Sequence, residues 1–384
     1  MRVEPFEIAV PDAVLVDLQR RIEHTRWPDE VEDVDWGQGT QLAYLRSLLD
    51  QWASGFDWRA AEAELNRLPH FRAELAGLWI HFVHVRAASE PSIPLVLTHG
   101  WPSTFLEMLP LVPLLTDPSA HGIDGPAFDV VIPSLPGYGF SDRPRTTGMS
   151  TRAIGALWHE LMQGLGYRRY GAGGTDFGAG VATFMALEVP EPLIGLHLTF
   201  LEERPYDGAG ARPLSEAERA YLDDSEAWER DEYAYAAIQG TKPQTAGYGL
   251  NDSPAGLAAW VIEKWRSWGD TAGELDERFS RDLLLSTLTV YWVTETITSS
   301  MRLYWEQRHG AAPTFGRDEF VTVPTAFARF AHEYISEGAP PREYVERMYA
   351  LERWTDMPRG GHFAALEEPR LLAEDIAAFF GALR

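Results

Sequence analysis

The segment Tyr167–Pro190 constrains the fold more than any other part of the chain. Its sequence, YRRYGAGGTDFGAGVATFMALEVP, reads as a short strand, then a glycine-rich turn, then a helix. Two apolar runs rich in β-branched residues, Ile93–Gly100 and Phe128–Gly137, come before it, and both are typical of buried parallel strands. A helix-like stretch, Thr151–Gly166, lies between them and this segment. Strands that alternate with helices predict a parallel sheet covered by helices.

The pattern changes twice more along the chain. In residues 1–90, apolar positions at helical spacing come first and a strand pair follows, so we expect an extension that packs on an α/β core. That core is expected in residues 91–201. Residues 202–310 lose the strand pattern and are charged and helix-rich, which predicts a helical lid inserted into the core. Residues 311–384 regain strand character, beginning with the predicted strand Val321–Phe330, and complete the core.

The charges and the absence of cysteine exclude several functions. The 384 residues include 57 Asp and Glu against 33 Lys and Arg, a formal net charge of −24. An acidic protein is repelled by nucleic acid and by anionic membranes, so we expect neither as a partner. Without cysteine there is no thiolate nucleophile and no Cys-based metal site. With no apolar run of roughly 18 residues, we expect a soluble, cytoplasmic protein.

Three loops that follow predicted strands or lie near the C-terminus carry reactive side chains. They are His99-Gly100-Trp101-Pro102, Gly174-Thr175-Asp176-Phe177-Gly178 and Gly360-Gly361-His362-Phe363. In open parallel sheets the active site lies at the carboxyl ends of the strands. Gly-x-Asp-x-Gly or GGH alone is more often an ordinary turn. The three loops together, in this order, predict a hydrolase.

The central loop has the small-x-nucleophile-x-small spacing of a nucleophile elbow, with Asp176 in the nucleophile position. A carboxylate attacks carbonyl carbon poorly, because the product would be a reactive anhydride. It can displace a leaving group from saturated carbon and so form an ester with the enzyme. The leaving group would then be the oxygen of a strained epoxide or a halide.

Hydrolysis of such an ester needs a base and a site for the oxyanion. His362 is the candidate base, since imidazole changes charge near neutral pH. The backbone amides of Trp101 and Phe177 are the candidate oxyanion hole. An acid that orients His362 is expected between the nucleophile and the histidine in chain order.

Motifs through most of the chain resemble those of the microsomal-type epoxide hydrolases, a branch of the α/β-hydrolase superfamily. They are HGWPST at 99, PSLPGYGFS at 133, GGTDFGAG at 173, LNDSPAGLAAWVIEKW at 250, SSMRLYWE at 299 and PRGGHFAALEEP at 358. PFEIAVPDAVLVDLQRRIEHTRWPDE is similar to the family's N-terminal region. The resemblance implies an α/β-hydrolase fold with a mostly parallel central sheet, an inserted helical lid and an N-terminal helical extension.

The resemblance also implies roles for individual residues. Asp176 matches the nucleophile and His362 the general base. Two lid tyrosines of the family donate hydrogen bonds to the epoxide oxygen; Tyr304 matches one and Tyr235 the other, with Tyr233 as the alternative. Glu333, in an aromatic-x-x-acid segment, matches the orienting acid, with Glu337 as the alternative.

The expected substrates are water and an apolar or aryl epoxide, with Trp101 and Phe177 as pocket walls and with no metal or organic cofactor. Phe177 stands where many relatives carry Trp. A haloalkane dehalogenase uses that indole to hold halide, so Phe177 disfavours this alternative. The other alternative is a non-catalytic protein that binds small molecules. Detoxification and natural-product biosynthesis both remain open as roles. For the oligomeric state we expect a homodimer.

Overall fold

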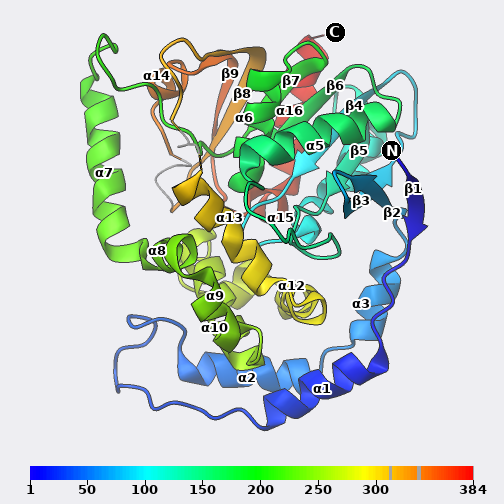
Figure 1. Ribbon diagram of the computed structural model, residues 1–384, viewed down its shortest axis with the longest axis vertical. Coiled ribbons are helices and arrows are strands. Elements are labelled where there is room, and N and C mark those ends of the chain that lie inside the picture. Colours follow the sequence, from blue (N-terminus) through cyan, green and yellow to red (C-terminus); the bar gives the residue numbers. More distant parts are fainter. Residues whose placement is uncertain (311–313, 335–338, 384) are drawn as a thin grey trace.

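The computed structural model describes residues 1–310, 314–334 and 339–383, which fold around one nine-stranded sheet (Figure 1). Its strand order is β1-β2-β3-β5-β4-β6-β7-β8-β9. The strands are β1 Val3–Phe6, β2 His70–Leu75, β3 Leu78–Val85, β4 Ser92–Thr98, β5 Ala127–Pro133, β6 Tyr170–Gly174, β7 Leu193–Leu198, β8 Val321–Phe330 and β9 Tyr349–Met357.

The six strands β5-β4-β6-β7-β8-β9 pair with one another in parallel, whereas β1, β2 and β3 form an antiparallel edge, and β3 also pairs with β5 in the antiparallel sense. All seven residues of β5 are buried, as expected for a strand covered on both faces. In the edge strand β1, exposed and partly buried residues alternate. The predicted α/β-hydrolase fold with a mostly parallel sheet is confirmed.

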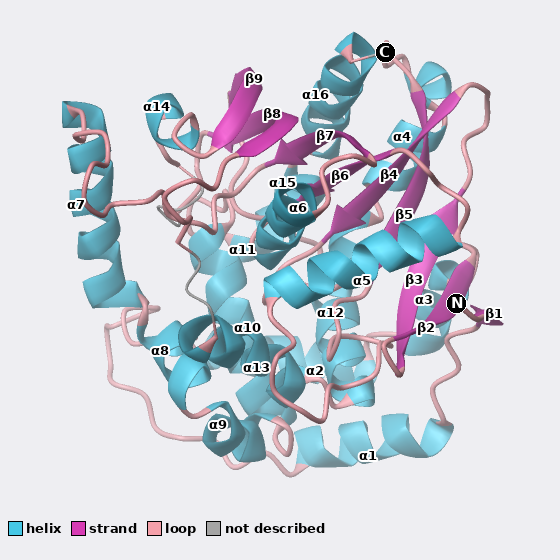
Figure 2. Ribbon diagram, turned by 45° about the horizontal axis from the view of Figure 1, so that its top comes forward, coloured by secondary structure: helices cyan, strands magenta, loops and turns pink. Residues whose placement is uncertain are grey.

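Helices cover both faces of the sheet. On one face α5 (Thr151–Gly164) packs against α6 (Phe177–Glu188), and on the other α4 (Leu111–Thr116) packs against α16 (Pro369–Ala382) (Figure 2). Two short 3-10 helices, η1 (Phe105–Met108) and η2 (Pro118–His121), flank α4. The buried apolar residues accordingly form two clusters.

Seven helices lie between β7 and β8 in the chain and cover the carboxyl ends of the strands (Figure 1). They are α7 Glu216–Glu232, α8 Ala234–Thr241, α9 Pro243–Leu250, α10 Pro254–Trp268, α11 Leu275–Arg278, α12 Arg281–Thr294 and α13 Ile297–His309. Local sequence sets several of their starts. Ser215 and Glu218 form a capping box at α7, and the Ser253 hydroxyl accepts from the Gly256 amide at α10. We call these seven helices, with the loops between them, the lid.

The N-terminal region contacts the lid as well as the sheet. Its helices are α1 Asp12–Glu23, α2 Leu42–Ser54 and α3 Trp58–Leu65, and α1 and α2 lie against α10 (Figure 1). Arg21 pairs with Asp252 at 2.5 Å, and the Trp52 indole donates to the Thr289 hydroxyl at 2.9 Å. Two short helices complete the core, α14 (Arg342–Val345) and α15 (Ala364–Glu367).

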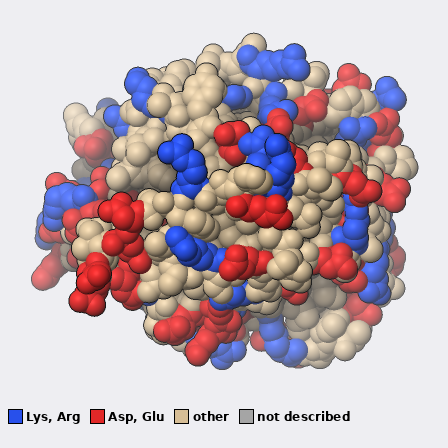
Figure 3. Space-filling view, turned by 90° about the horizontal axis from the view of Figure 1, so that it is seen from below, with Lys and Arg blue, Asp and Glu red and all other residues tan. Residues whose placement is uncertain are grey.

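The surface carries charges of both signs. On the face shown in Figure 3, acidic and basic side chains are interspersed among uncharged ones. Many of these charges are paired, as in the contact of Arg281 with Asp276 at 2.8 Å. Among the described helices, none combines the length and the apolar character needed to cross a membrane.

Candidate active site

Asp176 lies in the turn between β6 and α6, with backbone angles φ 48° and ψ −131°. Such a positive φ is strained for a residue with a side chain. The turn also forces small neighbours: a Cβ at Gly174 would lie 2.3 Å from the Gly178 carbonyl carbon, and one at Gly178 would lie 2.0 Å from the Thr98 carbonyl oxygen. The glycine spacing therefore has a steric cause, and the turn projects Asp176 beyond the strand ends.

The two amides expected to form an oxyanion hole both face Asp176. The Trp101 amide donates to Asp176 Oδ1 at 2.8 Å, and the Phe177 amide is also hydrogen-bonded to this carboxylate. A Cβ at Gly100 would lie 2.3 Å from Asp176 Oδ1, so only glycine allows this approach. Burial raises the pKa of Asp176, while the charge of His362 and the two amides oppose that rise.

His362 lies between two carboxylates. Its Nε2 is 3.7 Å from Asp176 Oδ2, and its Nδ1 is 3.1 Å from Glu333 Oε2. Burial lowers the pKa of His362, but the charges of Glu333 and Asp176 outweigh burial and raise it to about 9. The sequence pattern that predicted an acid after Val321–Phe330 therefore placed Glu333 within reach of the histidine. Glu337 lies outside the described residues.

Tyr304 and Tyr235 line the same cavity as Asp176. Tyr304, on α13, lies edge-on to Phe177 with ring centroids 4.7 Å apart, and Tyr235, on α8, stacks on Trp101 at 5.4 Å. Burial raises the pKa of Tyr304 well above its ordinary value, and the neighbouring Tyr235 and Asp176 raise it further. Tyr235 is 8% exposed, whereas the alternative Tyr233 is 37% exposed. The lid thus brings Tyr235 and Tyr304 together with Asp176.

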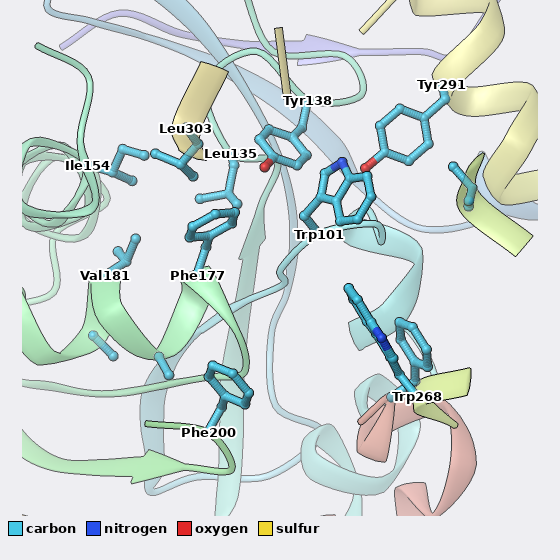
Figure 4. Packing of buried hydrophobic residues seen from close by; sticks show 14 of the residues in the cluster. Trp101, Leu135, Tyr138, Ile154, Phe177, Val181, Phe200, Trp268, Tyr291 and Leu303 are labelled. Carbon is cyan, nitrogen blue, oxygen red and sulfur yellow. The ribbon is translucent and has the colours of Figure 1, made fainter. Parts of the chain in front are cut away.

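A cavity of about 440 Å³ leads from Asp176 outward beneath the lid. The aromatic side chains of Phe177, Phe200, Tyr235 and Tyr304 line it, and Figure 4 shows the buried cluster to which Phe177 and Phe200 belong, with Trp101 and Trp268 on its other side. The outer end is polar, and its lining includes Arg204, Glu229, Gln307 and Arg308. The cavity therefore combines an aromatic interior with a polar mouth.

Comparisons with known proteins identify the family of this chain. A model of the epoxide hydrolase N terminus matches residues 3–108, and a model of the alpha/beta hydrolase fold matches residues 93–234. A predicted epoxide hydrolase of Stigmatella aurantiaca is 43% identical over 384 residues, which span 100% of this chain and 86% of that protein. The chain belongs to the epoxide hydrolase family.

Two other family members are similar over nearly their whole length. Epoxide hydrolase 1 of Sus scrofa is 38% identical over 408 residues, which span 99% of this chain and 89% of that protein. The crystal structure of juvenile hormone epoxide hydrolase from the silkworm Bombyx mori superposes with a TM-score of 0.85 at 32% identity. That match spans 100% of this chain and 94% of the silkworm chain.

Sequence reasoning missed one acidic residue of this epoxide hydrolase site. Glu107, on η1, is buried, and its Oε1 has no hydrogen-bond partner among the described residues. Burial raises the pKa of Glu107 to about 7; the charge of His362 lowers this pKa, and the charge of Asp176 raises it. A lone acid in the apolar run Phe105–Leu115 was the available signal. Within the described ranges, no three His, Asp or Glu side chains group as metal ligands.

Proposed function

We propose that this epoxide hydrolase opens its substrate through an ester on Asp176, which His362-activated water then hydrolyses to give a vicinal diol. The observation that carries this proposal is the unequal environment of the two Asp176 oxygens. Oδ1 accepts the Trp101 amide at 2.8 Å, whereas Oδ2 lies on the side of His362. One oxygen is therefore held as a future ester carbonyl, and the other is available to attack carbon.

In the first half-reaction, Asp176 Oδ2 forms a bond to an epoxide carbon, and the carbon–oxygen bond of the ring breaks. The departing oxygen becomes an alkoxide, which is strongly basic. Tyr235 and Tyr304 supply hydrogen bonds and a proton to that oxygen. The position of the two tyrosines supports this role, because their ring centroids are 5.8 Å apart and both side chains line the cavity that reaches Asp176.

In the second half-reaction, water attacks the carbonyl carbon of the ester while His362 accepts a proton from it. The charge of Asp176 helps to keep His362 protonated in the free enzyme. Ester formation removes that charge, so the pKa of His362 falls. The proton of the imidazolium returns to the tyrosinate that the first half-reaction leaves, and the neutral imidazole becomes available as a base. The negative charge that forms on Oδ1 is stabilised by the amides of Trp101 and Phe177. Collapse releases the diol and regenerates the carboxylate.

The cavity supports an apolar or aryl epoxide as substrate. Aromatic side chains line its inner end, and its volume of about 440 Å³ exceeds the space that a small terminal epoxide needs. We therefore suggest a substrate panel of styrene oxide, trans-stilbene oxide and a long-chain terminal epoxide.

A single turnover in oxygen-18 water tests the proposal. Excess enzyme is mixed with each epoxide of the panel, and the diol and the peptide that contains Asp176 are analysed by mass spectrometry. The ester route predicts unlabelled diol in the first turnover and label in Asp176 after repeated turnovers. Label in the first-turnover diol would mean that water attacks the epoxide directly.

The same experiment separates the dehalogenase alternative. A chloroalkane replaces the epoxide, and halide release is measured. We expect no release above background, because Phe177 offers no N–H donor to a departing halide. Halide release without any diol from the epoxide panel would reverse the assignment.

A further inference from the structure

The loop that carries His362 has four consecutive backbone amides, Gly360 to Phe363, and we call it the base loop. Each of these amides donates to an acceptor outside the base loop. The bonds are Gly360 to Asp270 Oδ2 at 3.0 Å, Gly361 to Glu367 Oε2 at 3.1 Å, His362 to the Trp268 carbonyl at 3.0 Å and Phe363 to Glu367 Oε1 at 2.9 Å. Two acceptors belong to the lid, and one carboxylate supplies the other two.

Glu367, the last residue of α15, is the centre of this arrangement. Its side chain is 0% exposed. Besides the two base-loop amides, its Oε2 accepts the Asp270 amide at 2.7 Å and the Arg278 Nε at 3.2 Å. One buried carboxylate thus binds the base loop, the lid segment Trp268–Asp270, which we call the lid turn, and helix α11.

The base loop and the lid turn are also in direct contact. A Cβ at Gly361 would lie 2.7 Å from both the Asp270 nitrogen and the Trp268 carbonyl oxygen, so glycine is required there. The Trp268 ring packs edge-on against His362 with centroids 5.2 Å apart, and its other neighbour, Tyr235, is also at 5.2 Å. The lid turn therefore holds the imidazole from two directions, through its backbone and through its indole.

We propose that Glu367 is a positioning residue for the hydrolytic half-reaction, which aligns His362 with the ester on Asp176. The inference rests on the proposed function. A general base must be held within a fraction of an ångström of its working position, and a shift of about 1 Å can cost roughly 10²-fold in rate. Glu367 does not touch the reacting atoms, so its effect passes through the base loop.

The proposal makes an asymmetric prediction for the two half-reactions. Alkylation requires Asp176 and the lid tyrosines but no general base, so the loss of Glu367 should leave it nearly intact. Hydrolysis requires His362 and should slow. The ester would then accumulate, and kcat and KM would fall together while kcat/KM stays close to that of the wild type. A general loss of stability would instead lower kcat/KM and leave no ester behind.

The variant Glu367→Gln is the direct test. Both carboxylate oxygens of Glu367 accept hydrogen bonds, whereas glutamine has only one acceptor oxygen. The NH2 group of the new glutamine would therefore face a backbone amide or Arg278, which are themselves donors. Glu368→Gln is the matched control. Glu368 contacts the same Arg278 at 3.0 Å and Arg359 at 2.7 Å, but among the described residues its carboxylate accepts from no base-loop amide.

Both variants are mixed with the most active epoxide of the panel, quenched in acid and weighed intact by mass spectrometry. For Glu367→Gln we expect hydrolysis to be about tenfold slower or more, with a mass increase of one epoxide per chain. For Glu368→Gln we expect the same proportion of alkylated enzyme as in the wild type. Equal losses in kcat and kcat/KM without adduct for Glu367→Gln, or the same adduct in both variants, would overturn the inference.

A second variant keeps the test valid if Glu367→Gln does not fold. Asp270→Ala, at a half-buried position, removes the hydrogen bond from Gly360. It should lower the ratio of hydrolysis rate to alkylation rate, as Glu367→Gln does, but by a smaller amount. An unchanged ratio in Asp270→Ala would then refute the inference. His362→Gln serves as the reference for the proposed function. If His362→Gln traps no ester, the proposed function is wrong. If it traps the ester, but the Glu367 and Asp270 variants keep the wild-type ratio of hydrolysis rate to alkylation rate, only the positioning role is refuted.

Discussion

At the scale of single residues, the site depends on buried charges held close together. His362 lies between Asp176 and Glu333, at 3.7 Å and 3.1 Å. The two carboxylates raise the pKa of the histidine against the effect of burial. In the mechanism that we propose, the proton of the free enzyme is therefore on His362 until Asp176 loses its charge in the ester.

Replacing His362 with Gln should separate the two half-reactions. Alkylation of Asp176 should continue, while turnover falls by about 10² to 10⁴ because the general base is absent. Intact-protein mass spectrometry after addition of the epoxide should show a stable adduct. Asp176→Ala is the control and should show none. An H362Q enzyme that turns over normally would remove the histidine from the mechanism.

The pKa of His362 also predicts a pH dependence of stability. Because it is raised in the folded protein from 6.5 to about 9, protonated His362 favours folding. This stabilisation is complete below about pH 6.5 and is lost as the pH rises through about 9. The melting temperature of the wild type should therefore fall more over this range than that of H362Q. Parallel curves for the two proteins would contradict the assigned pKa.

At the scale of elements, the strand–turn–helix unit of β6 and α6 has no room for a side chain at Gly178. Gly178→Ala should destabilise the protein by about 3 kcal/mol or prevent folding, because the new Cβ would overlap the Thr98 carbonyl. Chemical denaturation measures the change. Gly249→Ala, on α9 with nothing within 4 Å of its Cβ, is the control. It should be neutral or stabilise by up to about 1 kcal/mol.

The lid buries Tyr235 and most of Tyr304 but leaves the alternative Tyr233 partly exposed. Tyr235→Phe and Tyr304→Phe should each lower the rate of alkylation by about 10²-fold, because the alkoxide loses a proton donor. Tyr233→Phe should change the rate by less than about twofold, since that side chain is 37% exposed. Stopped-flow measurement of ester formation checks all three. A larger effect at Tyr233 than at Tyr235 would exchange their roles.

At the scale of the whole molecule, the net charge of −24 bears on which substrates reach the cavity. A neutral epoxide is not steered by this field, so its kcat/KM should change by less than about twofold between about 0.05 M and 0.5 M salt. An anionic epoxide should react slowly at low salt and faster as salt screens the repulsion. A strong salt dependence for the neutral substrate would contradict this prediction.

Local sequence determined much of this protein. Alternating apolar strands and helices predicted the α/β fold, and Val321–Phe330 is a strand with the predicted bounds. The spacing of Gly174, Asp176 and Gly178 predicted the elbow. The clash that requires glycine at position 174 is local, with Gly178, whereas the clash at position 178 is with Thr98 on a strand far away in the chain. The edge strand β1 was not predicted, because four residues carry too little pattern to show a strand whose pairing partner lies some 70 positions away.

Only the tertiary structure decided which distant side chains meet. Tyr233 and Tyr235 are two positions apart in the same stretch of sequence, so local pattern does not distinguish them. The packing of the helices places Tyr235 against Trp101. Glu107 and Glu367 read as ordinary acids in the sequence, yet one is buried beside Asp176 and the other binds the base loop and the lid turn together. The physical reason is the same in each case. Short-range patterns encode local conformation, whereas burial and electrostatic coupling arise from contacts between residues far apart in the chain.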